Sequence, residues 1–208
     1  MEKTQFNDPD DRLMIACASM STDPPSPGEL DLARIALAKW HSPSEFVALV
    51  DEWPSCVVVR TRFLQEAWIL AEFARQVEVE RLRLSGEEWP DAYIEIDGLT
   101  KSVEITEVMD PGRRRDDELK EEGTWIRLDP VKDWVTRAEA IPGALKTRLE
   151  RKAKKRYSTP TLLLVYLNIS IGFLRPDEHE TDKLIAEIKA QHASAFEQIV
   201  VLWREKLY

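Results

Sequence analysis

The chain of 208 residues is 43% hydrophobic and 32% charged, a balance that is typical of a folded globular domain and excludes wholesale disorder. Its 29 basic and 38 acidic residues give a formal net charge of −9, so a polyanionic partner is disfavoured unless the cations gather in one place. Two cysteines exclude a disulfide framework and a four-cysteine zinc site.

No apolar run is long enough to span a bilayer, and residues 1–11 are polar and acidic, unlike a secretion signal. We therefore expect a cytoplasmic protein with no membrane partner. The sequence leaves the oligomeric state open, a homodimer included.

The first 57 residues predict an N-terminal arm and a helical extension that packs on the core. Residues 1–25 are rich in Asp, Pro, Ser and Thr, which indicates a loosely ordered arm. Two Ser-Pro-x-Glu motifs follow, at Ser26–Glu29 and Ser42–Glu45, and each is a capping box with proline at the first helical position. They predict two short helices, the second of which ends before Pro54.

Residues 58–208 predict a core in which helices and strands interleave. The expected elements, in chain order, are a helix at 58–75, strands at 77–84, 90–96 and 101–108, a charged insertion at 109–142 with a strand near Trp125–Leu128, a helix at 143–156, a buried strand at 161–168, a helix near 180–194 and a strand near 197–203. This order predicts the α/β (α+β) class, with a mixed central sheet flanked by helices.

The pair Asp97-Gly98 between two alternating runs is a strong hairpin signal. A two-residue turn places Ile96 opposite Leu99, and the same register places Asp91 opposite Glu104. This register separates an apolar face from a polar one, as the alternation of side chains along a strand requires. We therefore expect the Cβ atoms of Asp91 and Glu104 about 4.5–5.5 Å apart on the polar face.

Two carboxylates at that distance repel each other unless a cation or a shared proton lies between them. A hard divalent ion such as Mg²⁺, held by carboxylate oxygens and water, resolves the conflict and activates water for attack on a phosphate. The alternative is that both acids lie on a solvated sheet face with no ligand. The residues alone leave both interpretations open.

Pro90-Asp91 on one strand and Glu104-Ile105-Thr106 on the next resemble the signature of the PD-(D/E)xK (restriction-endonuclease-like) nuclease superfamily, in which Pro-Asp precedes Glu-x-Lys. The order of expected elements over residues 58–168 is similar to the αβββαβ core of that superfamily. Residues 1–57 are then an addition to the core.

The resemblance implies that Asp91 and Glu104 bind Mg²⁺ or Mn²⁺, with the main-chain carbonyl of Ile105 as a third ligand. It also implies that an acid from the first core helix approaches the same site. Glu66 is the first candidate for that acid and Glu72 the second, while the alternative for Glu66 is a charge on the helix surface.

One departure from the family pattern concerns catalysis, because Thr106 stands where the motif carries lysine. Threonine supplies no cation to orient a water or to stabilise negative charge. The register places Lys101 on the opposite face, which makes it a poor substitute. Some members of the family carry the lysine on a nearby helix, and Lys152 and Lys155 are the candidates for that position.

The segment 146–156 gathers seven cations against one acid, which is the concentration that an acidic protein needs to hold a polyanion. The alternative is a solvated amphipathic helix whose cations pair with the acidic body. The candidates for contacts with nucleic acid are Lys146, Arg148, Arg151, Lys152 and Lys155 of this segment and Arg113 and Arg114 of the insertion.

The sequence thus predicts a metal-dependent phosphodiester hydrolase that acts on nucleic acid, DNA rather than RNA, with Asp91, Glu104 and Thr106 at its catalytic site and an activity impaired by Thr106. One alternative is a nuclease-like fold that has lost its chemistry and serves as a binding or regulatory module. Another is an unrelated α/β interaction domain in which the motif is accidental.

Overall fold

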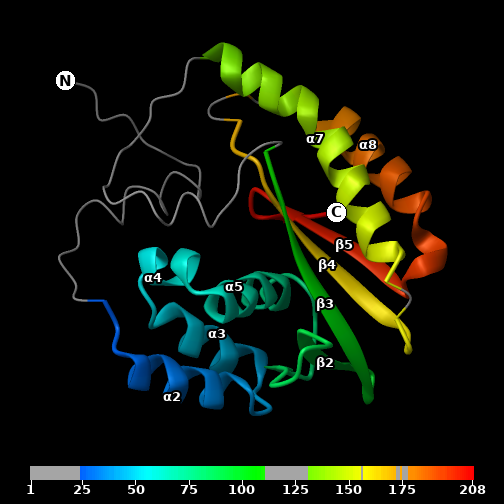
Figure 1. Ribbon diagram of the computed structural model, residues 1–208. Helices are drawn as coiled ribbons and strands as arrows, with labels where there is room; N and C mark the ends of the chain where they lie inside the picture. Colours follow the sequence, from blue (N-terminus) through cyan, green and yellow to red (C-terminus); the bar gives the residue numbers. More distant parts are fainter. Residues whose placement is uncertain (1–23, 111–130, 156, 172–173, 175–177) are drawn as a thin grey trace, which may run out of the picture.

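The computed structural model describes residues 24–110, 131–155, 157–171, 174 and 178–208. Its centre is a mixed sheet of six strands in the order β1-β2-β3-β4-β5-β6. The pairs β1–β2, β2–β3 and β5–β6 are antiparallel, while β3–β4 and β4–β5 are parallel. Helices lie on both faces of this sheet (Figure 1), so the α/β class with a mixed sheet is confirmed.

The helical extension begins with α2 (Pro27–Leu37) and α3 (Pro43–Asp51). Both capping boxes are formed, because the hydroxyls of Ser26 and Ser42 accept the third backbone N–H of each helix and the partner glutamates accept in return. The helix predicted at 58–75 is instead two helices, α4 (Ser55–Arg60) and α5 (Arg62–Ala74). Thr61 between them has an extended backbone, in keeping with the low helix propensity of the β-branched run before it.

The hairpin has the predicted register. Strand β2 (Ala92–Ile96) pairs with β3 (Leu99–Met109), and Ile96 faces Leu99. Asp97 and Gly98 both have positive φ, at 53° and 70°, as a tight hairpin turn requires. Strand β1 (Arg81–Leu84) is shorter than predicted, because the Val77 N–H still bonds to the Phe73 carbonyl at the end of α5.

Helix α7 (Val131–Ala153) is longer than the predicted helix at 143–156 and takes up residues 131–142 of the predicted insertion. Pro142 lies inside the helix rather than before its start. Proline removes one backbone donor from the ladder, a loss that this long helix tolerates. Residues 1–23 of the arm predicted at 1–25, the predicted strand at Trp125–Leu128, and Arg113 and Arg114 lie outside the described residues.

The C-terminal part of the chain, which contributes the second half of the sheet, follows the predictions closely. It consists of β4 (Thr161–Asn168), α8 (Glu178–Ala190), the short 3₁₀ helix η1 (Ala193–Ala195), β5 (Gln198–Trp203) and β6 (Lys206–Leu207). The parallel pairing of β3 with β4 requires the chain to cross the sheet through α7. That crossover brings the basic end of α7 over β3.

Two buried clusters cover the two faces of the sheet, and β4 contributes alternate residues to both. Leu162 and Leu164 pack with α2–α5, whereas Leu163 and Val165 pack with α7 and α8. Helices α2, α3 and α5 therefore share a core with β1 and β2, while α7 and α8 cover β3 to β5 on the other face.

Candidate functional site

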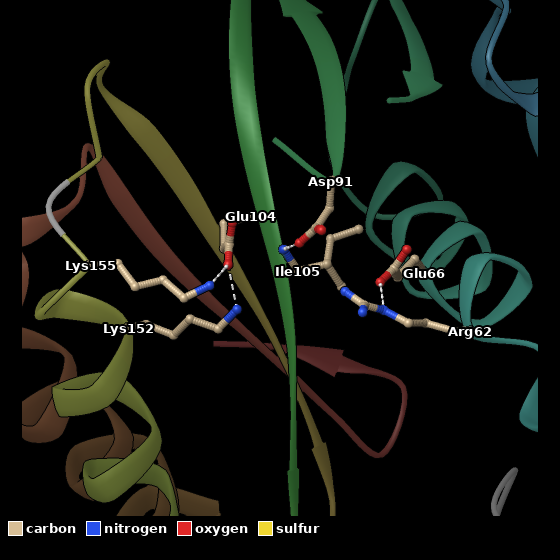
Figure 2. A network of polar contacts seen from close by, with 7 residues as sticks. All are labelled: Arg62, Glu66, Asp91, Glu104, Ile105, Lys152 and Lys155. Carbon is tan, nitrogen blue, oxygen red and sulfur yellow. Dashed lines mark hydrogen bonds and ion pairs between the residues drawn. The ribbon is translucent and has the colours of Figure 1, made fainter. Parts of the chain in front are cut away.

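Glu104 is a buried carboxylate in the middle of β3, with 3% of its surface exposed. Figure 2 shows its side chain pointing from β3 toward the end of α7, where two lysines meet it. Lys152 donates a hydrogen bond to Glu104 Oε1, and Lys155 Nζ lies 3.3 Å from the same oxygen. Lys152 is itself buried, whereas the Lys155 side chain is 56% exposed.

The period of α7 explains how Lys152 reaches the sheet. Leu145 and Leu149 are fully buried, and Lys152 follows them by seven and three residues, which places it on the same face of the helix. Its charged end therefore points inward, where Glu104 is its partner. Sequence reasoning named Lys152 as a candidate but missed this signal, which predicts an inward-facing lysine.

Asp91 lies one residue before β2 and continues the pairing of the strands, because its carbonyl accepts the Ser85 N–H at 2.9 Å. Its carboxylate Oδ2 accepts the Ile105 N–H at 2.7 Å. Asp91 thus satisfies the backbone N–H of Ile105, a β3 residue outside the stretch that pairs with β2. In Figure 2 the Asp91 and Glu104 carboxylates lie on the two sides of β3, so they do not stand side by side on one polar face.

The two acids remain close enough to interact electrostatically. Burial, with the negative charges of Glu104 and Glu66, raises the pKa of Asp91 to about 6, against the lowering effects of the Ile105 hydrogen bond and Lys152. Within the described part of the chain, no lysine or arginine forms an ion pair with Asp91. Asp91 is therefore the one acid of the group that lacks a cation of its own.

Glu66 approaches this group from α5. Its carboxylate pairs with Arg62 at 2.8 Å and is 19% exposed, and Figure 2 shows it on the Asp91 side of β3. Sequence reasoning missed Arg62, although its spacing of four residues from Glu66 is the signal for such a pair. Glu72 pairs instead with Arg75 at 3.3 Å and does not contribute to the group.

Thr106 is buried, with 6% of its surface exposed, and adds no charge to the site. Lys101 pairs with Glu197 at 2.6 Å and is not part of it. Tyr157 lies near Glu104, and burial together with the negative charges of Glu104 and Asp91 raises the pKa of its phenol. Its ring stacks on that of Trp89, with the two ring centroids 5.9 Å apart.

The other cations of the basic segment have different surroundings. Lys146 and Arg151 are exposed, and Arg148 is half-buried, with a pKa lowered by burial and by Arg151. Their position on α7 leaves Lys146 and Arg151 accessible to a ligand, while Lys152 is occupied by Glu104.

Carboxylate and carbonyl oxygens are the ligands that a hard divalent cation prefers, although Asp91 and Glu104 lie on the two sides of β3 in this structure. Among the described residues, no three His, Cys, Asp or Glu side chains gather as metal ligands. Asp91, Glu104 and the Ile105 carbonyl remain, and that carbonyl projects from the same edge of β3 as its N–H, toward Asp91. Mg²⁺ typically binds one or two carboxylates and completes its shell with water and phosphate oxygens. A half-buried Asp91 without a cation suits such an ion.

Comparisons with protein families, with curated proteins and with solved structures found no match for this chain. No described helix is both long enough and apolar enough to cross a membrane.

Proposed function

We propose that the protein is a metal-dependent phosphodiester hydrolase that acts on nucleic acid. The observation that carries this proposal is the lysine of α7 that meets the buried carboxylate of Glu104, with Asp91 within electrostatic reach of both. Lys152 reaches Glu104 from the helix, at the point where Thr106 leaves the strand motif without its cation. A lysine contributed from a helix supplies the positive charge that threonine cannot.

The arrangement of the elements supports the same proposal. Helix α5, strands β1 to β3, helix α7 and strand β4 follow one another as αβββαβ, with β3 and β4 parallel. This is the order that the restriction-endonuclease-like core implies, and the acids lie at β2 and β3, where that core carries its motif. Because fold alone does not establish function, the proposal depends on the side chains of the site.

The proposal assigns a role in this reaction to each residue of the site. Asp91 and Glu104 would hold Mg²⁺ or Mn²⁺, with the Ile105 carbonyl as a further ligand. The bound ion supplies a Lewis acid and lowers the pKa of its water. Lys152 has a pKa lowered by burial, although Glu104 opposes the shift, and a lysine held there orients the attacking water or stabilises charge on the phosphate. Lys146, Arg148 and Arg151 are positioned on α7 to contact neighbouring phosphates.

A second candidate is a nucleic-acid-binding module without chemistry. It is favoured by the ion pairs of Glu104, because two lysines already neutralise this acid without a metal. Calorimetric titration with Mn²⁺ separates the two candidates. If the protein is a hydrolase, it should bind one Mn²⁺ ion and its Asp91→Asn variant should bind none. If it is a binding module, the unaltered protein should bind no Mn²⁺.

Hydrolysis itself is tested on labelled single-stranded and duplex DNA, and on RNA, with Mn²⁺ or Mg²⁺ in the buffer. We expect cleavage of DNA that falls at least a hundredfold in Asp91→Asn, Glu104→Gln and Lys152→Met. Glu72→Gln is the matched control, because it changes an acid of α5 that pairs with Arg75 instead. Unchanged cleavage in Asp91→Asn, or none by the unaltered protein with any of these substrates, would refute the proposal.

A further inference from the structure

Four residues form an aromatic and basic cluster on β1, β2 and the segment before α3. They are Trp40, Arg81, Arg83 and Tyr93. The guanidinium of Arg83 lies 5.3 Å from the Trp40 ring centroid and 4.4 Å from that of Tyr93. Arg81 lies 4.8 Å from the Trp40 ring. Cation–π contacts of this kind hold an arginine in a fixed orientation.

The two arginines differ in their acidic partners. Arg81 forms an ion pair with Glu95, so its charge is balanced within the protein. Arg83 forms no hydrogen bond and no ion pair with any described residue, and its buried Nε donor is unsatisfied. An unsatisfied buried donor on a permanently charged group is costly unless a ligand accepts from it. Arg83 is thus a fixed cation that lacks an anion, in a protein of net charge −9.

The register places this cluster beside the carboxylates. Arg83 faces Tyr93, which faces Ser102, and Glu104 follows Ser102 by two residues on the same face of β3. Strand spacing and rise put the Cα atoms of Arg83 and Glu104 about 12 Å apart. A few nucleotides of a single strand span that distance.

Helices α7 and α8 leave this part of the sheet uncovered. The buried cluster under them contains residues of β3, β4 and β5 but none of β1 or β2 among those described. Side chains of β1 and β2 that point away from α5, including Arg83 and Tyr93, are half-buried rather than enclosed. Arg83 and Tyr93 are therefore partly accessible to a ligand.

We propose that Trp40, Arg83 and Tyr93 bind single-stranded nucleic acid, with a backbone phosphate on Arg83 and adjacent bases stacked on the aromatic rings. The inference rests on the proposed function, because it names the substrate of the Asp91–Glu104 site. Planar guanidinium groups match phosphate geometry, and unpaired bases stack on aromatic side chains. Bases in a duplex are already stacked on each other, so the cluster favours single strands.

The test is the affinity for a fluorescent oligothymidylate, measured by anisotropy in EDTA at fixed salt so that binding is separated from cleavage. Arg83→Gln and Trp40→Leu are each expected to weaken binding roughly tenfold or more, while Trp40→Phe retains most of it. Arg34→Gln is the matched control and should change the affinity less than twofold. Arg34 belongs to α2, on the other face of the sheet, and lies over the Phe63 ring of α5.

Three results would overturn the inference. They are an Arg83→Gln variant that folds and binds like the unaltered protein, equal binding of duplex and single strand, and equal competition by oligoglutamate of the same charge, which would indicate a site for any anion. Circular dichroism establishes that each variant is folded. Binding without cleavage would refute only the hydrolase, whereas cleavage that does not depend on Arg83 would refute only this inference.

Discussion

The buried pair Glu104–Lys152 makes a sharp prediction about stability. Replacement of one partner leaves the other charge in the interior, which costs about 3–5 kcal/mol in buried pairs. For Lys152→Met we expect a smaller cost, about 2–3 kcal/mol, because Lys155 remains 3.3 Å from Glu104. Glu104→Leu should cost about 2–4 kcal/mol. Burial already lowers the pKa of Lys152, and without Glu104 this lysine can lose its proton, which limits the cost of leaving its charge unpaired in the interior.

The double variant Glu104→Leu/Lys152→Met removes both charges and should come within about 1 kcal/mol of the unaltered protein, or exceed it. Urea unfolding at pH 7, followed by circular dichroism, gives the four free energies of unfolding and hence the coupling between the two residues. Lys155→Ala is the control and should cost less than about 1 kcal/mol, because its side chain is 56% exposed. If the two single effects simply add up in the double variant, the pair is not coupled and the account of this site is wrong.

Three further predictions concern pH, the hairpin turn and a helix cap. The pKa of Asp91 is raised from 3.8 to about 6 in the folded state, so the folded protein binds more protons than the unfolded chain between these values, and stability should fall by up to about 3 kcal/mol as the pH rises from 4 to 7. Asp91→Asn should remove this part of the pH dependence in urea unfolding, and an unchanged slope would contradict the raised pKa. Gly98→Ala should cost about 1 kcal/mol because φ is +70°, whereas Gly143→Ala in α7, with no atom within 4 Å of the added Cβ, should stabilise by about 0.5–1 kcal/mol. Ser42→Ala should lower the thermal midpoint and cost about 1 kcal/mol, and no effect would mean that its capping box contributes nothing.

The parts of the fold that were predictable from sequence are those fixed by local chemistry. Asp97-Gly98 determines the turn and therefore the register of β2 and β3, and the capping boxes at Ser26 and Ser42 determine where two helices begin. The predictions failed where a tertiary context overrides a local signal. Pro142 should end or start a helix, yet α7 continues through it, because Ile141, Leu145 and Leu149 on either side of it are buried in the core that α7 shares with the sheet and α8.

The site was predictable only in part, for a related reason. The predicted register holds from Ala92 to Ile96, but Asp91 precedes the first paired residue of β2 and its side chain turns to the Ile105 N–H, so it does not stand beside Glu104 on one face as predicted. Lys152 reaches Glu104 through a crossover of the chain, and no spacing in the sequence gives the position of that helix on the sheet. The helical period alone would have given its inward direction.

The polar groups at this site argue for a function other than stability. A sheet that needs only to be stable gains more from apolar side chains at positions 104 and 152 than from a buried ion pair. Asp91 is less favourable still, because its charge is half-buried among other acids without a cation. Perturbed carboxylates of this kind are typical of sites that do chemistry or bind a cation. We therefore expect Glu104→Leu/Lys152→Met to keep a stability within about 1 kcal/mol of the unaltered protein, or to exceed it, and yet to be unable to bind Mn²⁺. A double variant that binds Mn²⁺ with unchanged affinity in calorimetry would show that the acids at β2 and β3 have no such role.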